Sequence, residues 1–487
     1  MYEHDRRRYA ALLGLALVVG CAVRLVTYTG TIAADDLTHA WAAVHFWDDP
    51  IEQSMPTGAD SAYTVNARRI GVNFPMWIAA ELAGPSEASF AAVPLVFSLL
   101  GILAVAAWAR VLAGPRAGVI AGWLWAVVPI DVWHATVFMQ DNIFATVLAA
   151  GLAAMAWAER DDRSLGWFAA GVAVGYLQYV KENAVLLLAI VVVAGIARSW
   201  RARRIHRGTI WLLAGSAVIH LLAVGYFARV FGDPLYYVNA WFGRQAAVEV
   251  EASQPFPRNF LRLGLYLSWG GALGIGLPIA VGYGVRWLRR ATDAPRTLRL
   301  QLAIIAAVQS LLVLHVLRWG AWTMRYLLQV TPALVALAAV GLATAWPNMT
   351  RRKRTWLIAG AIATTAFGLV FGHPQHGRFR NELLRGAYAA IEREIPSDVP
   401  VYVVANPARA AHYTDRVFDL YAHYRARSGG WHITHTPDSI TRGVVVRASY
   451  ERYPGPPNPP RGNPLFVGRT VDHYGIALWI DVRTVGL

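Results

Sequence analysis

Two adjacent carboxylates follow the first long apolar run of the sequence. They are Asp35 and Asp36, in the segment Ala34-Asp35-Asp36-Leu37. Adjacent acids at the edge of an apolar segment are costly unless they are solvated, paired or functional. A carboxylate in this place can act as a general base on a hydroxyl group, or it can help to bind a metal ion. The less specific alternative is that Asp35 is a solvated loop residue.

A third acid, Asp141, opens another apolar run in the segment Phe138-Met139-Gln140-Asp141-Asn142. Acids are favoured at helix N-termini, so one interpretation of Asp141 is an ordinary N-cap. The other interpretation is functional: Asp141 orients the base Asp35 or the acceptor, or joins Asp35 and Asp36 in holding a divalent cation such as Mg²⁺ or Mn²⁺.

Isolated cations stand at the ends of two later apolar runs. Lys181 precedes Glu182 in a short turn, and Arg325 precedes Tyr326. Lys181 is either a snorkelling side chain, a local ion pair with Glu182, or a point charge for a phosphate. Arg325 is either an interfacial anchor or the partner of Lys181. Carboxylates and cations around one cavity suit a phosphorylated lipid, with a base on one side and a leaving-group phosphate on the other.

Other kinds of site find less support in the sequence. The single cysteine, Cys21, excludes an intrachain disulfide and a cysteine-based zinc site. Histidines such as His432 and His435 lack acidic partners at matching spacing, which favours ordinary surface histidines. No phosphate-binding loop, GxSxG or HExxH motif is present.

Composition indicates a membrane protein with many spans. Of 487 residues, 56% are hydrophobic and 15% are charged, and the mean hydropathy is +0.37. Soluble chains carry about 25% charged residues, so a disordered protein, a fibrous protein and a typical cytosolic enzyme are excluded. The net charge of +15 comes from arginines in short clusters between apolar runs. This pattern disfavours nucleic-acid binding, which needs one contiguous basic face.

Eleven apolar runs approach the length of about 20 residues that a spanning helix needs. They are Tyr9–Tyr28, Ser89–Ala109, Ala117–Ile130, Asn142–Ala158, Ser164–Val180, Asn183–Ala197, Gly208–Ala228, Leu263–Val285, Leu300–Leu317, Leu327–Trp346 and Thr355–Phe371. If these runs alternate in direction, the arginine clusters all fall on one side, which the positive-inside rule identifies as cytoplasmic. We therefore expect a cytoplasmic N-terminus in the cell membrane and an extracytoplasmic working face.

The soluble parts of the chain fall on that working face. The first outer loop, residues 29–88, contains two stretches at helical spacing, from Leu37 to Trp47 and from Phe74 to Leu82, which predict amphipathic helices beside the membrane. The tail predicts a helix over Asn381–Glu394 followed by strands at Val399–Val404, Gly443–Ser449, Leu465–Gly468 and Ile476–Val482. The predicted fold is a mainly α membrane bundle over residues 1–372 with a small extracytoplasmic α/β domain over 373–487.

The order of these motifs resembles the glycosyltransferase-C superfamily, in the branch of protein O-mannosyltransferases, aminoarabinose transferases and related lipopolysaccharide glycosyltransferases. Its acidic pair in the first outer loop matches Asp35-Asp36, and its acid at the start of the fourth helix matches Asp141. A glycine-rich helix that ends in lysine matches 171–181, and an Arg-Tyr-Leu motif matches 325–327. The chain differs from the family pattern at Asn73-Phe74-Pro75-Met76, where a His-Pro-Pro-Leu-like segment is common.

This resemblance implies an integral membrane glycosyltransferase, a hexosyl- or pentosyltransferase that uses a polyprenyl-phosphate sugar donor. The acceptor would be an extracytoplasmic glycan, lipid or protein, and the anomeric configuration would invert. Asp35 would be the general base, with Asp36 and Asp141 assisting, and Lys181, Arg325 and Tyr326 would bind the donor phosphate. The alternatives are a transporter or lipid flippase without transfer activity, and a non-catalytic scaffold.

Overall fold

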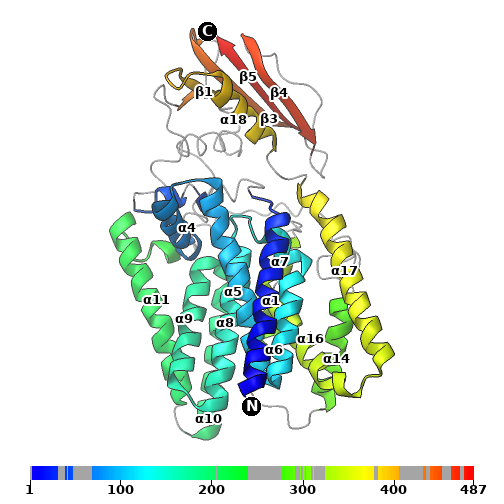
Figure 1. Ribbon diagram of the computed structural model, residues 1–487. Helices are drawn as coiled ribbons and strands as arrows, with labels where there is room; N and C mark the ends of the chain where they lie inside the picture. The colour runs from blue at the N-terminus through cyan, green and yellow to red at the C-terminus, as the bar shows by residue number, and fades with distance from the viewer. Residues whose placement is uncertain are drawn as a thin grey trace. The chain divides into compact units, whose positions relative to one another are not determined.

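The computed structural model describes the greater part of the chain (Figure 1). The described residues are 3–30, 39–40, 42–47, 68–203, 206–239, 276–290, 297, 300–301, 303–308, 311, 324–377, 382–404, 431–434, 439–451, 462–471 and 477–487. The chain forms two compact units. Unit 1 comprises Met1–Tyr28, Arg68–Val72 and Ala91–His373, and unit 2 comprises Thr29–Ala67, Asn73–Phe90 and Pro374–Leu487.

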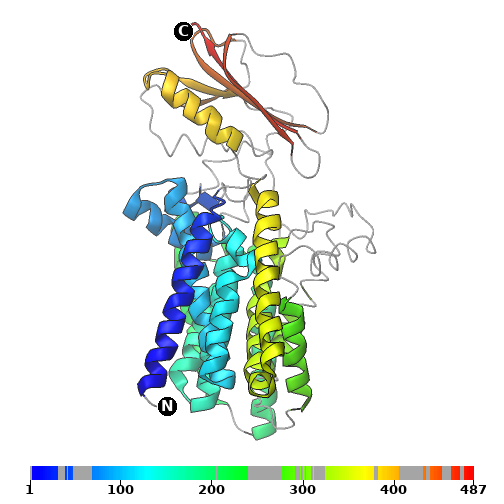
Figure 2. The same cartoon turned by 45° about the vertical axis from the view of Figure 1, so that its right-hand side comes forward.

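Unit 1 is a bundle of helices (Figures 1 and 2). Its helices are α1 (Glu3–Val26), α5 (Glu87–Ala113, which begins in unit 2), α6 (Pro115–Val127), α7 (Pro129–His134), α8 (Gln140–Asp161), α9 (Ser164–Val180), η1 (Glu182–Ala184), α10 (Val185–Ala202), α11 (Arg207–Phe231), α14 (Gly276–Arg290), η2 (Met324–Gln329), α16 (Thr331–Ala345), η3 (Trp346–Asn348) and α17 (Arg351–Gly377).

With one exception, the predicted apolar runs that the structure describes in full are helical. The runs at Leu263–Val285 and Leu300–Leu317 lie partly outside the described residues. Among the described helices, four are long and apolar enough to cross a membrane: Arg7–Val26, Glu87–Ala113, Gln140–Asp161 and Arg207–Phe231. The run at Ala117–Ile130 is not one helix, because Pro129 ends α6 and starts the short helix α7.

Neighbouring helices approach closely at glycines, and the residues in contact there show whether two helices run parallel. A Cβ on Gly171 of α9 would overlap Leu212 of α11, and one on Gly175 would lie 3.0 Å from the carbonyl oxygen of Ser216. Residue numbers rise together along this contact, so α9 and α11 run parallel. By the same reasoning α1 is parallel to α6, since Gly118 lies against Tyr9 and Gly20 lies against Ala126.

The basic turns of unit 1 gather at the end where α1 begins. The Arg110 guanidinium lies 4.8 Å from the centre of the Tyr9 ring, close to the start of α1. Helix α8 begins near the other end of α1, because Asn142 and Arg24 both bind Asp131. The far end of α8, with Arg160, therefore lies at the basic end. Figure 1 shows the N-terminus at this end of the bundle and α7 at the opposite end.

Unit 2 contains α4 (Ile70–Ala83, which starts in unit 1), α18 (Glu382–Glu394) and a mixed sheet. The strands are β1 (Val401–Val404), β2 (Trp431–Thr434), β3 (Gly443–Glu451), β4 (Asn463–Val471) and β5 (Ala477–Val485), in the order β2-β1-β3-β5-β4. Strand β1 is parallel to β2 and β3, whereas β5 is antiparallel to β3 and β4.

The tail elements agree with the sequence prediction except for β2, which was not expected. Its four residues are too short for a clear alternation of polar and apolar side chains. Helix α18 packs on β4 and β5, and Phe466 of β4 lies against Gly386 of the helix. Val444, Val446, Ile480 and Val482 form the buried core of the sheet. The helix predicted over Phe74–Leu82 is present as α4, but it is apolar on most sides rather than amphipathic.

Candidate functional site

The acid Asp141 lies in the first turn of α8 and is fully buried. Its Oδ1 accepts a hydrogen bond of 2.9 Å from Nζ of Lys181, which is also buried. Lys181 stands directly after the last residue of α9. The N-cap interpretation of Asp141 is wrong, because the N-cap of α8 is Met139 and Asp141 lies two residues inside the helix. Two residues predicted separately from the sequence are therefore in direct contact.

The acid beside Lys181 has a cation of its own. Nε and Nη2 of Arg69 donate to the two carboxylate oxygens of Glu182 over 3.2 and 3.0 Å. Burial by itself raises the pKa of Glu182, but the charge and hydrogen bonds of Arg69 outweigh it and hold that pKa below its ordinary value. The structure thus assigns Lys181 to Asp141 and Glu182 to Arg69.

The segment that carries Arg69 is held against the end of α9. The hydroxyl of Tyr176 donates to the carbonyl oxygen of Gly71. A Cβ on Gly71 would lie only 3.0 Å from the backbone of Tyr179, so the two segments approach more closely than a larger residue allows. This contact brings residues 68–72 to the Lys181–Glu182 turn, although about 110 residues of sequence separate them.

The short helix η2 reaches the same end of the bundle. It packs against α7 and α8. Nδ2 of Asn183, next to Glu182, donates to Oε1 of the buried Gln329 over 2.9 Å. Arg325 and Tyr326 belong to η2, so their backbone lies at this end. Their side chains are outside the described set, and their function as phosphate ligands remains a prediction.

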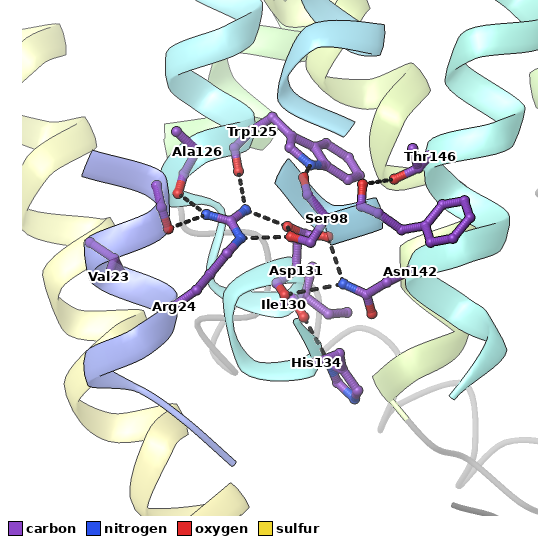
Figure 3. A network of polar contacts seen from close by, with 12 residues as sticks. Val23, Arg24, Ser98, Trp125, Ala126, Ile130, Asp131, His134, Asn142 and Thr146 are labelled. Atoms are coloured by element: carbon purple, nitrogen blue, oxygen red, sulfur yellow. Dashed lines mark hydrogen bonds and ion pairs between the residues drawn. The ribbon is translucent and has the colours of Figure 1, made fainter. Parts of the chain in front are cut away.

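A second buried ion pair, between Arg24 and Asp131, was not predicted (Figure 3). Arg24 near the end of α1 pairs with Asp131 of α7, and neither side chain is exposed. The hydroxyl of Ser98 donates to Asp131 over 2.5 Å, and Nδ2 of Asn142 donates to Oδ1 of Asp131 over 2.9 Å. The signal in the sequence was Arg24 itself, the one charged residue inside the first apolar run.

Asp35 and Asp36, the other two acids predicted for the site, lie outside the described residues. Their approach to Asp141 therefore stays a prediction. Within the described ranges, no three histidine, cysteine, aspartate or glutamate side chains group around one point. The expected Mg²⁺ or Mn²⁺ site on Asp35, Asp36 and Asp141 therefore stays a prediction.

Five of these polar residues lie at one end of unit 1, and we call them the Lys181 site: Asp141, Lys181, Glu182, Arg69 and Gln329. Each of the two carboxylates fixes a cation in a buried or half-buried position. A fixed ammonium or guanidinium group, shielded from water, interacts more strongly with a phosphate than a mobile one at the surface. The charges of the two pairs cancel, but both cations are held in fixed positions, as the binding of a phosphate group would require.

Part of the chain matches a known protein family. Residues 69–227 match the family model of dolichyl-phosphate-mannose-protein mannosyltransferases. These residues begin at Arg69 and include Asp131, Asp141, Lys181 and Glu182. No curated protein sequence matches the chain.

Solved structures share the fold over most of the chain. ArnT from Cupriavidus metallidurans in its apo state matches with a TM-score of 0.63 and 15% identity, over 98% of each chain. The same protein bound to undecaprenyl phosphate matches with a TM-score of 0.58 and 15% identity over 97% of each chain.

The oligosaccharyltransferase AglB from Archaeoglobus fulgidus, in complex with an inhibitory peptide and a dolichol-phosphate, matches with a TM-score of 0.54 and 13% identity. That match covers 88% of this chain and 64% of AglB. The resemblance to the glycosyltransferase-C superfamily that the sequence predicted is confirmed at the level of the fold.

Proposed function

We propose that this chain, which has the fold of membrane glycosyltransferases, transfers a sugar from a polyprenyl-phosphate donor to an acceptor outside the cytoplasm. The observation that carries this proposal is the Asp141–Lys181 ion pair beside Glu182–Arg69 at one end of the bundle. Two structures of this fold are described as bound to a polyprenyl phosphate, undecaprenyl phosphate in ArnT and dolichol-phosphate in AglB.

The reaction needs a base for the acceptor and a cationic site for the leaving group. The Asp35 carboxylate takes the proton of the acceptor hydroxyl, whose oxygen then bonds to the anomeric carbon of the sugar. The bond from that carbon to the phosphate oxygen breaks on the opposite face, so the configuration inverts and polyprenyl phosphate leaves. Lys181, Arg325 and Tyr326 stabilise the charge that develops on the phosphate. Asp36 and Asp141 assist as auxiliary acids.

The proposed arrangement in the membrane follows the charge distribution. The basic end of unit 1 faces the cytoplasm, and the Lys181 site faces the outer leaflet. Eleven spans then place the first loop and residues 373–487 on the outer side. Arg110 and Arg160 at the basic end support this orientation, because both lie at the end of the bundle opposite Lys181.

Transfer from a radiolabelled polyprenyl-phosphate sugar to membrane acceptors tests the proposed function. A general base contributes typically 10²–10⁴-fold to the rate, so Asp35→Asn should lower kcat by about that factor. Asp36→Asn is the matched control, because it removes the neighbouring charge and should lower kcat by a smaller factor. Full activity of Asp35→Asn at normal expression would remove Asp35 from the mechanism.

Two further measurements address the acceptor and the metal ion. Mass spectrometry of envelope glycans from cells with and without the protein should show the loss of one sugar substituent. A transporter or flippase would change the lipid pool without any direct transfer in the purified system. For the metal ion, loss of transfer in EDTA and its recovery with Mg²⁺ or Mn²⁺ would support a cation on Asp35, Asp36 and Asp141.

A further inference from the structure

The polar network around Asp131 joins α1, α5, α6, α7 and α8 in the interior of unit 1 (Figure 3). Nη1 of Arg24 donates to the carbonyl oxygens of Gly20 and Ala126, both over 2.8 Å. Its Nε donates to Ser98 over 2.6 Å, and its Nη2 pairs with Asp131. Most donors of the guanidinium group are therefore used, which fixes the ion pair rigidly in a buried place.

One arm of this network ends on the helix that carries Asp141. Nδ2 of Asn142 donates to Oδ1 of Asp131 over 2.9 Å and approaches the Asp131 carbonyl oxygen at 3.4 Å. Asn142 follows Asp141 in the first turn of α8, and the N-cap residue Met139 makes no side-chain cap. First turns without a cap fray easily, because their backbone N–H groups lack partners within the helix.

We propose that Asn142 is a positioning residue. Backed by the Arg24–Asp131 pair, it holds the first turn of α8 in place, and Asp141 in turn holds the Lys181 ammonium group. The functional part of this proposal, donor binding through Lys181, rests on the proposed function. The structural part does not, because the position of Lys181 can be measured in the absence of any substrate.

Asn142→Ala is the informative variant, because it cuts the link to α8 and leaves the Arg24–Asp131 ion pair intact. Replacing Arg24 or Asp131 would strand a buried charge and endanger folding. Ser98→Ala is the matched control, since the Ser98 hydroxyl bonds to the same ion pair, to Arg24 and Asp131, but not to Asn142. Asn142→Ser, which keeps a smaller polar group, replaces Asn142→Ala if the alanine variant does not accumulate in folded form.

Amine acetylation of the purified full-length protein, read by mass spectrometry, reports the position of Lys181 directly. The chain has only two lysines, Lys181 and Lys353, and the exposed Lys353 serves as the internal reference. Losing a hydrogen bond to a charged group favours local opening, so Asn142→Ala should speed acetylation of Lys181 relative to Lys353 by about tenfold. Ser98→Ala should leave that ratio unchanged.

Transfer kinetics complete the test. We expect Asn142→Ala to raise the KM for the polyprenyl-phosphate donor while kcat changes less. We expect Ser98→Ala to leave this KM unchanged. An unchanged acetylation ratio in Asn142→Ala, or an equal rise in both variants, would overturn the proposal. A changed ratio in a protein that transfers no sugar would uphold the positioning and refute the proposed function instead.

Discussion

At the scale of single residues, the candidate site consists of charges that hold each other in place. The Glu182 carboxylate is bound by Arg69 through two hydrogen bonds, and its pKa lies below the ordinary value of 4.5. A group whose pKa is lowered by folding stabilises the folded state above its unfolded pKa. That contribution is lost as the pH falls through the folded pKa.

Glu182→Gln should therefore destabilise the protein at pH 7, by about 1–3 kcal/mol for hydrogen bonds to a charged group. The difference between wild type and variant should shrink as the pH falls below about 4.5, the ordinary pKa of the carboxyl. Thermal unfolding in detergent over a pH series measures this difference in stability. Asp161→Asn is the control, because its partner Arg160 is exposed. A gap between wild type and Glu182→Gln that stays constant down to pH 3 would contradict this assignment.

The sequence identified Asp141 and Lys181 one at a time but not as a pair. Each stood out as a charge next to an apolar run, which is a local signal. Their contact joins the start of α8 to the end of α9, and Arg24 meets Asp131 across 107 positions of sequence. Such contacts depend on how helices pack, and the periodicity of one segment carries no information about its distant neighbours.

At the scale of elements, the close contact of α9 and α11 depends on glycine. A Cβ on Gly215 of α11 would overlap the carbonyl oxygen of Phe168 in α9, and a Cβ on Gly171 would overlap that of Leu212. Small residues at such crossings let two helix backbones approach closely. Because Lys181 directly follows the last residue of α9, this packing also sets where the Lys181 turn lies.

Gly215→Leu should force the two helices apart and destabilise the protein by about 1–3 kcal/mol, the usual cost of overpacking. Gly225→Ala in the same helix is the matched control. Among the described residues, no atom outside the adjoining backbone of α11 lies within 4 Å of its Cβ position, so alanine should be neutral or stabilising by up to about 1 kcal/mol through helix propensity. Thermal unfolding of both variants measures the contrast. Equal melting temperatures would show that the α9–α11 crossing does not need glycine.

The sequence predicted which segments form helices and strands more accurately than it predicted where a helix ends or is interrupted. The apolar run Ser164–Val180 is α9 residue for residue. The run Ala117–Ile130 was expected to be one helix, but Pro129 divides it into α6 and α7. This division matters, because α7 carries Asp131 into the interior. The strand β2 was missed because four residues are too few for a visible pattern.

At the scale of the whole molecule, the account requires the basic end of unit 1 to face the cytoplasm. In a Cys21→Ser background the chain has no other cysteine, so single cysteines report the side of the membrane. Ser164→Cys, at the exposed first residue of α9, should resist a membrane-impermeant maleimide in intact cells. Pro234→Cys, in the exposed segment after α11, should react. The reverse pattern would invert the proposed topology.

The most direct test of the account is the affinity of the purified protein for undecaprenyl phosphate, measured by native mass spectrometry. Lys181→Met removes the buried ammonium group, and Lys353→Met removes the other lysine of the chain at an exposed position. We expect Lys181→Met to weaken binding by about tenfold or more, the order of one charge-assisted hydrogen bond to phosphate. We expect Lys353→Met to bind as the wild type does. Equal affinity of all three proteins for the lipid would show that this end of the bundle does not bind the donor phosphate.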